Sequence, residues 1–207
     1  MRFIQNMLDV CVGGRAAFHA NWGETHFLHG DMPAAVERYT QALLLEPDNI
    51  PLRLQRARVY LHLGDYEHAL ADDQHCLTLD SHCALAHLHI GLIAFEQGDH
   101  ETALGHVNLA IYYDPRQPLA YNQRGLINEA LGNALGAIAD YTQAIRLSPS
   151  SAVIDIAYTN RGGARAKHGD LRGALADYRR YLAMGGGQRH GDQREIERLI
   201  DALEQRH

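Results

Sequence analysis

The sequence predicts an all-α fold, a solenoid of antiparallel helix hairpins with a C-terminal capping helix. Two observations support this. A glycine followed by Asp or Asn recurs at Gly30, Gly64, Gly98, Gly132 and Gly169, and these successive pairs are 34, 34, 34 and 37 residues apart. An alanine follows each pair at one fixed offset, at Ala35, Ala69, Ala103, Ala137 and Ala174. A constant period of this size indicates stacked copies of one supersecondary unit.

Each repeat is expected to be a helix hairpin. About 13 residues with helical periodicity precede the glycine, and a similar stretch follows the Asp or Asn. The glycine can adopt the left-handed conformation that ends the first helix, while the Asp side chain caps the second. The small residues in the first helices are expected to meet the alanines of the second helices, and these are Gly23, Ala57, Gly91, Gly125 and Gly162.

The chain is accordingly divided into a short leader, five repeats and a cap. The predicted repeats are 16-49, 50-83, 84-117, 118-151 and 155-188. Residues 1-15 are expected to be an N-terminal segment or a short capping helix, linked to the first repeat by Gly13 and Gly14. Residues 189-207 carry Ile196, Leu199, Ile200 and Leu203 at amphipathic spacing. They predict a helix that covers the open apolar face of the last repeat.

Composition favours a folded cytoplasmic protein that does not insert into membranes. The 207 residues are 46% hydrophobic and 21% charged, and no apolar run approaches the roughly 20 residues that a membrane helix needs. The three cysteines are too few and too irregular for a disulfide framework. A net charge of -6 argues against a nucleic-acid partner. The first three repeats are acidic, whereas the fifth is basic.

The repeat pattern resembles the tetratricopeptide repeat family. The fourth repeat shows it most completely, with Tyr121, Arg124-Gly125, Gly132-Asn133, Ala137, Tyr141, Ala144 and Pro149. The resemblance covers residues 16-188 and implies a right-handed superhelix whose first helices line a concave groove. The glycine-rich and alanine-rich repeats resemble bacterial members. The departures from the family pattern are Arg56, Arg124 and Arg161 in place of Leu, Asp73 in place of an aromatic residue, and Tyr181 in place of Ala.

The resemblance also implies which residues face the groove. The sixth position of each repeat always carries a side chain that can both donate and accept hydrogen bonds, similar to an asparagine ladder in some members of the family. These residues are Asn21, Gln55, His89, Gln123 and Asn160. The other groove candidates are Leu54, Arg58, Leu88, Leu92, Phe95, Asn122, Leu126 and Glu129. Each leucine either faces the groove or packs between neighbouring first helices, because spacing alone does not separate the two.

The functional expectation is a non-catalytic adaptor, scaffold or chaperone-like protein. Its groove would bind a protein segment with apolar anchors, without a cofactor. One alternative is self-assembly, in which the acidic N-terminal repeats meet the basic fifth repeat of another copy. Another is a metal-binding or enzyme-regulating accessory subunit, suggested only by the 14 histidines. No phosphate loop, nucleophile elbow or zinc-protease motif occurs in the sequence.

Overall fold

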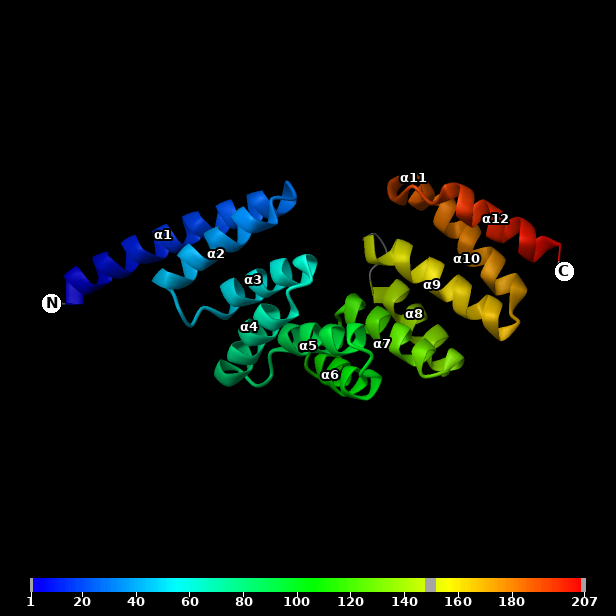
Figure 1. The fold of residues 1–207 in the computed structure, drawn as a ribbon, viewed down its shortest axis with the longest axis horizontal. Coiled ribbons are helices and arrows are strands. Elements are labelled where there is room, and N and C mark those ends of the chain that lie inside the picture. The colour runs from blue at the N-terminus through cyan, green and yellow to red at the C-terminus, as the bar shows by residue number, and fades with distance from the viewer. Residues whose placement is uncertain (1, 148–151, 206–207) are drawn as a thin grey trace. The chain divides into compact units, whose positions relative to one another are not determined.

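The computed structural model describes residues 2–147 and 152–205, with side chains from residue 14 to 147 and from 153 to 205. Every regular element in these ranges is helical (Figure 1). The helices are α1 (Arg2–Leu28), α2 (Met32–Leu45), α3 (Ile50–Leu63), α4 (Tyr66–Leu79), α5 (Ala84–Glu96), α6 (His100–Tyr113), α7 (Pro118–Ala130), α8 (Ala134–Leu147), α9 (Ala152–His168), α10 (Leu171–Ala183), α11 (Gly186–His190) and α12 (Gln193–Glu204). The predicted all-α fold is confirmed.

The chain forms two compact units, Met1–Gln97 and Gly98–His207. In the first unit, the hairpins α1–α2 and α3–α4 pack on one another and α5 packs on α4. In the second, α6 packs on α7, the hairpins α7–α8 and α9–α10 follow, and α11 and α12 lie on α10 (Figure 1). Each helix therefore packs mainly on its neighbours in sequence, as expected for consecutive helix hairpins. The repeat boundaries themselves stay a prediction.

The Gly-Asp pairs act at the hairpin turns as the sequence predicts. Gly64 has a φ of 71°, in the left-handed region that ends α3. The next residue, Asp65, accepts a hydrogen bond from the backbone N–H of His68 in the first turn of α4. The equivalent hydrogen bond occurs at the four remaining hairpin turns, with the acceptors Asp31, Asp99, Asn133 and Asp170. One dipeptide thus ends one helix and begins the next.

Three of the predicted small residues, Gly23, Gly125 and Gly162, lie against tyrosine rings, which was not expected from the sequence. A Cβ at Gly125 would lie 2.4 Å from Cε1 of Tyr141. Gly23 and Gly162 face Tyr39 and Tyr178 in the same way. The absent Cβ leaves the room that a ring requires, so the glycine of one helix and the tyrosine of the other form a matched pair. Each of these tyrosines occupies the twenty-fourth position of its predicted repeat.

The N-terminal helix is continuous through the predicted link. Helix α1 runs for 27 residues, through Gly13 and Gly14, whereas its partner α2 has 14 residues. A glycine inside a helix costs only about 1 kcal/mol relative to alanine, so a glycine pair does not by itself break a helix.

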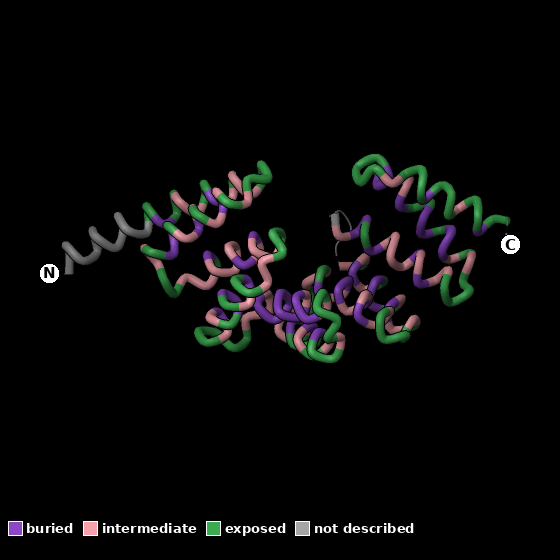
Figure 2. Tube along the Cα trace, viewed as in Figure 1, coloured by how far each residue is buried: buried purple, intermediate pink, exposed green. Residues whose placement is uncertain are grey.

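The C-terminal cap is made of two helices instead of one. The short α11 begins directly after Gly185, which has a φ of 77°, and α12 follows it. Ile196 and Leu203 of α12 are buried in one apolar cluster with Leu175 and Tyr178 of α10. The tube in Figure 2 shows buried stretches along α10. Leu199 remains 40% exposed. The predicted amphipathic helix therefore covers the last hairpin, and of its four apolar residues Ile196 and Leu203 are the most deeply buried.

Candidate functional site

Adjacent first helices meet through a polar contact in the first unit. The guanidinium of Arg58 in α3 donates to Oε2 of Glu24 in α1 over 2.5 Å. The hydroxyl of Tyr39 donates to the same oxygen over 2.8 Å. Burial and the Glu24 carboxylate raise the pKa of Tyr39 well above its usual value, so the phenol remains a neutral donor. In each unit, we call the side on which the first helices carry their predicted groove residues the first-helix face of that unit; these helices are α1, α3 and α5 in the first unit and α7 and α9 in the second.

An aromatic ring adjoins this ion pair. The guanidinium of Arg58 lies 4.2 Å from the ring centre of Phe27, and the ring of His62 meets the same phenyl edge to face at 4.9 Å. The Nδ1 atom of His62 is 2.9 Å from the backbone carbonyl oxygen of Arg58. The face therefore combines a charged pair with apolar surface, a combination suited to holding a peptide by mixed contacts.

The second unit repeats the arrangement. Glu129 of α7 accepts a hydrogen bond from Tyr141 over 2.7 Å and pairs with Lys167 of α9 over 3.0 Å. About two turns earlier on α7, Asn122 accepts at its Oδ1 a hydrogen bond of 3.3 Å from the side-chain amide of Asn160. Lys167 is the only lysine of the chain, and its side chain is 76% exposed. Two predicted groove residues of α7, Asn122 and Glu129, thus each contact a residue of the adjacent first helix α9.

The five residues at the sixth position are not equally accessible. Asn21 is exposed, Gln55 and Asn160 are half-buried, and His89 and Gln123 are buried. His89 is directed at the neighbouring hairpin, with Nδ1 3.0 Å from Oδ1 of the fully buried Asp73. A continuous ligand-binding ladder stays a prediction. Asn160 does contact the neighbouring first helix, but its hydrogen-bond partner there is Asn122, at the fifth position of its predicted repeat.

The predicted groove leucines include both buried core residues and partly exposed residues, the two alternatives that the sequence left open. Leu88 is 1% exposed and belongs to the core. The remaining apolar candidates are half-buried, namely Leu54, Leu92, Phe95 and Leu126. Leu119 of α7 and Ile156 of α9, each at the second position of its predicted repeat, are 39% and 44% exposed. These last two are the accessible apolar residues of the face in the second unit.

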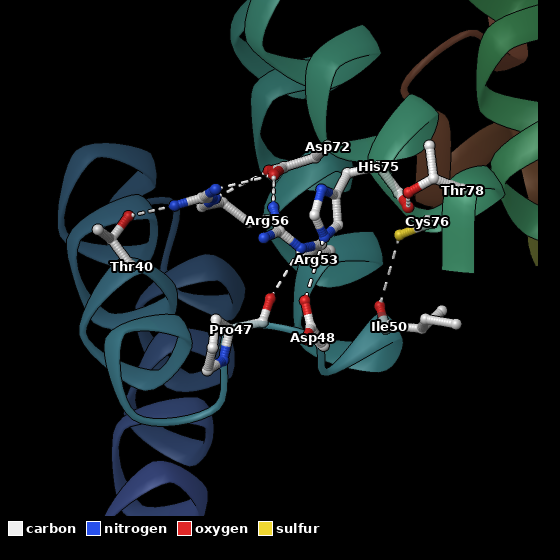
Figure 3. Close-up of polar contacts among 10 residues, drawn as sticks. All are labelled: Thr40, Pro47, Asp48, Ile50, Arg53, Arg56, Asp72, His75, Cys76 and Thr78. Carbon is white, nitrogen blue, oxygen red and sulfur yellow. Dashed lines mark hydrogen bonds and ion pairs between the residues drawn. The ribbon is translucent and has the colours of Figure 1, made fainter. Parts of the chain in front are cut away.

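A series of arginine–aspartate pairs was not predicted. In the first unit, Arg56 binds Asp72 with two hydrogen bonds of 2.8 Å, and its third nitrogen donates to Thr40 of the preceding hairpin (Figure 3). Arg53 also donates to Asp72, over 3.2 Å. Asp72 is 3% exposed. Two arginines therefore compensate the buried carboxylate, which lies between consecutive hairpins.

The same pair recurs in both hairpins of the second unit. Arg124 binds Asp140 and reaches Asn108, and Arg161 binds Asp177 and reaches Thr142. These arginines are the departures from the family's leucine. The signal in the sequence was an Asp 16 residues after each of them.

The histidines and cysteines do not gather into a metal site in the part of the chain whose placement is described. No three His, Cys, Asp or Glu side chains are grouped there. His75 pairs with Asp48 at 3.4 Å. Cys76 is buried, and desolvation raises the pKa of its thiol to about 12. Similarly, none of the helices described here combines the length and the apolar character needed to cross a membrane.

Comparisons with known proteins identify the repeats. Family models for the tetratricopeptide repeat match residues 26–71 and 90–159. The curated "Tetratricopeptide repeat protein 36" of Danio rerio is 41% identical over 58 residues, which cover 28% of this chain and 31% of that protein. The match thus spans about a third of the relative's length.

Solved structures share the fold. TTC0263, a thermophilic TPR protein of Thermus thermophilus, superposes with a TM-score of 0.72 at 20% identity, covering 91% of this chain and 98% of that one. YrrB, described as a TPR protein with an unusual peptide-binding site, gives a TM-score of 0.56 at 16% identity, covering 80% and 84% of the two chains. At these identities the likeness concerns the fold alone.

Proposed function

Because the chain belongs to the tetratricopeptide repeat family, whose members mediate protein–protein interactions, we propose that it is a non-catalytic adaptor that binds a segment of a partner protein on its first-helix face. The supporting observation is that the same group of side chains, a glutamate bonded to a tyrosine and a cation, links adjacent first helices in both units. It gives the face a fixed polar framework beside accessible apolar residues.

The bound segment would be extended or a short helix with apolar anchors. Leu119 and Ile156 are exposed where such anchors would contact the second unit. Asn160, one turn after Ile156, is half-buried and carries an amide group that can both donate and accept hydrogen bonds, whereas its partner Asn122 is only 4% exposed and supports it from within. Lys167 adds one exposed positive charge. An extended segment with apolar residues and at least one carboxylate would match this surface.

Self-assembly through the basic fifth repeat has less support. Arg161 and Arg165 both bind Asp177, and Arg179 binds Glu204 of the cap. These three arginines are thus neutralised by carboxylates of the same chain, which reduces the attraction of the repeat for the acidic repeats of another copy.

A matched pair of variants tests the proposal. The variant Leu119→Glu, Ile156→Glu changes exposed apolar residues of first helices, and Tyr112→Glu, Leu135→Glu changes residues of second helices that are 78% and 65% exposed. We expect proteins captured from the native lysate by the intact chain, and measured by quantitative mass spectrometry, to be lost by the first variant and retained by the second. Equal retention by both, with both folded by circular dichroism, would refute binding on the first-helix face.

A further inference from the structure

The first hairpin has an exposed aromatic surface with arginines beside it. Phe18 and Trp22 of α1 are 53% and 44% exposed, and their ring centres are 5.6 Å apart. The guanidinium of Arg38 in α2 lies 4.9 Å from the ring centre of Trp22. Arg15 is exposed one turn before Phe18 on the same side of α1. We call the surface formed by Arg15, Phe18, Trp22 and Arg38 the end face.

The repeat pattern shows what this surface would contact. Trp22 and Arg38 occupy the positions at which the later hairpins carry the arginine and aspartate of the pairs described above. In those hairpins the arginine reaches back to the preceding hairpin, as Arg56 does to Thr40 over 2.9 Å. Trp22 therefore lies on the side where a preceding hairpin would pack, with a large apolar ring in place of an internally paired charge.

The C-terminal hairpin shows how this protein covers such a side. There α12 lays Ile196 and Leu203 against α10, and Glu204 accepts a hydrogen bond from Arg179 over 2.5 Å. The cover is an amphipathic helix whose apolar residues pack on the hairpin and whose carboxylate pairs with an arginine of its second helix. Arg38 is likewise an arginine of a second helix beside apolar surface.

The charges of the end face favour the same kind of helix. Its two arginines are accompanied by His19 and His26 on α1, and Asp31 lies 3.4 Å from His26. Glu37 precedes Arg38 but projects about 100° away around the helix. In a chain of net charge -6, this is a locally positive and aromatic surface.

We propose that the end face is a docking site for an acidic amphipathic helix of a partner protein, with apolar residues over Phe18 and Trp22 and a carboxylate on Arg38. This site is separate from the first-helix face and does not depend on the function proposed for it. Docking removes the ring of Trp22, the only tryptophan of the chain, from water.

A peptide with the sequence of residues 192–205 is the probe, because α12 has the required chemistry and contains no tryptophan. The peptide, capped at both ends, is titrated into the full chain while Trp22 emission is recorded, and a dye-labelled copy is followed by anisotropy. We expect a saturable blue shift of the emission. We also expect Arg38→Glu and Phe18→Glu each to weaken binding at least tenfold, whereas Lys167→Glu on the first-helix face leaves it unchanged.

Three outcomes would overturn the docking site. One is the absence of any saturable change in emission or anisotropy. Another is that the Phe18→Glu variant binds the peptide as tightly as the native chain. Phe18 is exposed, so this substitution should leave the fold intact, and thermal melting checks that it does. The third is an emission shift that follows the concentration of the protein alone, which would assign the end face to contacts between copies of this chain.

Discussion

At the scale of single residues, the hairpins depend on pairs of complementary size. Gly125 and Tyr141 show this most clearly, because the buried ring of Tyr141 fills the space where a Cβ would lie. The ring also holds its hydroxyl against Glu129. One glycine therefore positions both a core side chain and a carboxylate of the first-helix face.

Replacing Gly125 by alanine should destabilise the protein by about 1–3 kcal/mol, because the new methyl group would overlap the Tyr141 ring. The matched control is Gly105→Ala in α6, where a Cβ would meet nothing within 4 Å. That change should stabilise by about 0.5–1 kcal/mol, since alanine is the better helix former. Urea unfolding of both variants measures the effect. Equal stability of the two would show that the glycine–tyrosine contact is not tight.

At the scale of elements, neighbouring hairpins are joined by buried charge as well as by apolar packing. Between α4 and α5, Asp73 takes the position that tyrosine holds in three other hairpins, and it is fully buried against His89. Its Oδ2 atom has no hydrogen-bond partner. Desolvation raises the pKa of Asp73, and the hydrogen bond from His89 opposes that rise only in part.

This burial predicts a pH dependence of stability. The folded chain retains a proton on Asp73 at pH values where the unfolded carboxyl, with a pKa of about 4, has lost it. Its contribution is therefore greatest at low pH and is lost as the pH rises from about 4 through the raised pKa. Among the groups around it, the charge of His89 lowers the pKa of Asp73, the Asp72 carboxylate raises it, and the Cys76 thiol is neutral.

The variant Asp73→Asn cannot titrate, yet its amide oxygen can still accept from His89. We expect the stability of the native chain relative to this variant to fall as the pH rises above about 4. Unfolding in urea at a series of pH values measures the difference, with the exposed Asp201→Asn as the control. Parallel stability curves for the native chain and Asp73→Asn would contradict the assignment.

The helices and turns could be predicted from the sequence, whereas the side chains that contact each other across adjacent helices could not. The period and the Gly-Asp pairs locate each turn, because backbone conformation is a local property. Spacing does not reveal which residue of one helix faces which residue of the next. The tyrosine opposite Gly125 and the aspartate opposite Arg124 were therefore missed, although both recur at constant separations.

In the candidate site, too, some contacts could be predicted from the sequence and others could not. The contacts Glu129–Lys167 and Asn122–Asn160 join residues 38 apart, close to one repeat period, so their neighbourhood was predictable from the register. The burial of His89 was not predictable, because it depends on Asp73 replacing a tyrosine in the hairpin before it. Gly13 and Gly14 were interpreted as a break although a helix tolerates them.

At the scale of the whole molecule, we propose two kinds of surface for partners. Each unit repeats the Glu–Tyr–cation group on its first-helix face, and the first unit adds the aromatic end face. Because each helix packs mainly on its sequence neighbours, the stability of the fold is shared among local interfaces.

The most direct test of partner binding on the first-helix face is site-specific photo-crosslinking in the native lysate. A photoreactive amino acid is placed at Ile156, on a first helix, or at Leu135, on a second helix, and cross-linked proteins are identified by mass spectrometry. We predict a discrete partner cross-linked from Ile156 and absent from Leu135. Cross-linking of the same partner from Leu135 alone would place the binding surface on the second helices and contradict the account.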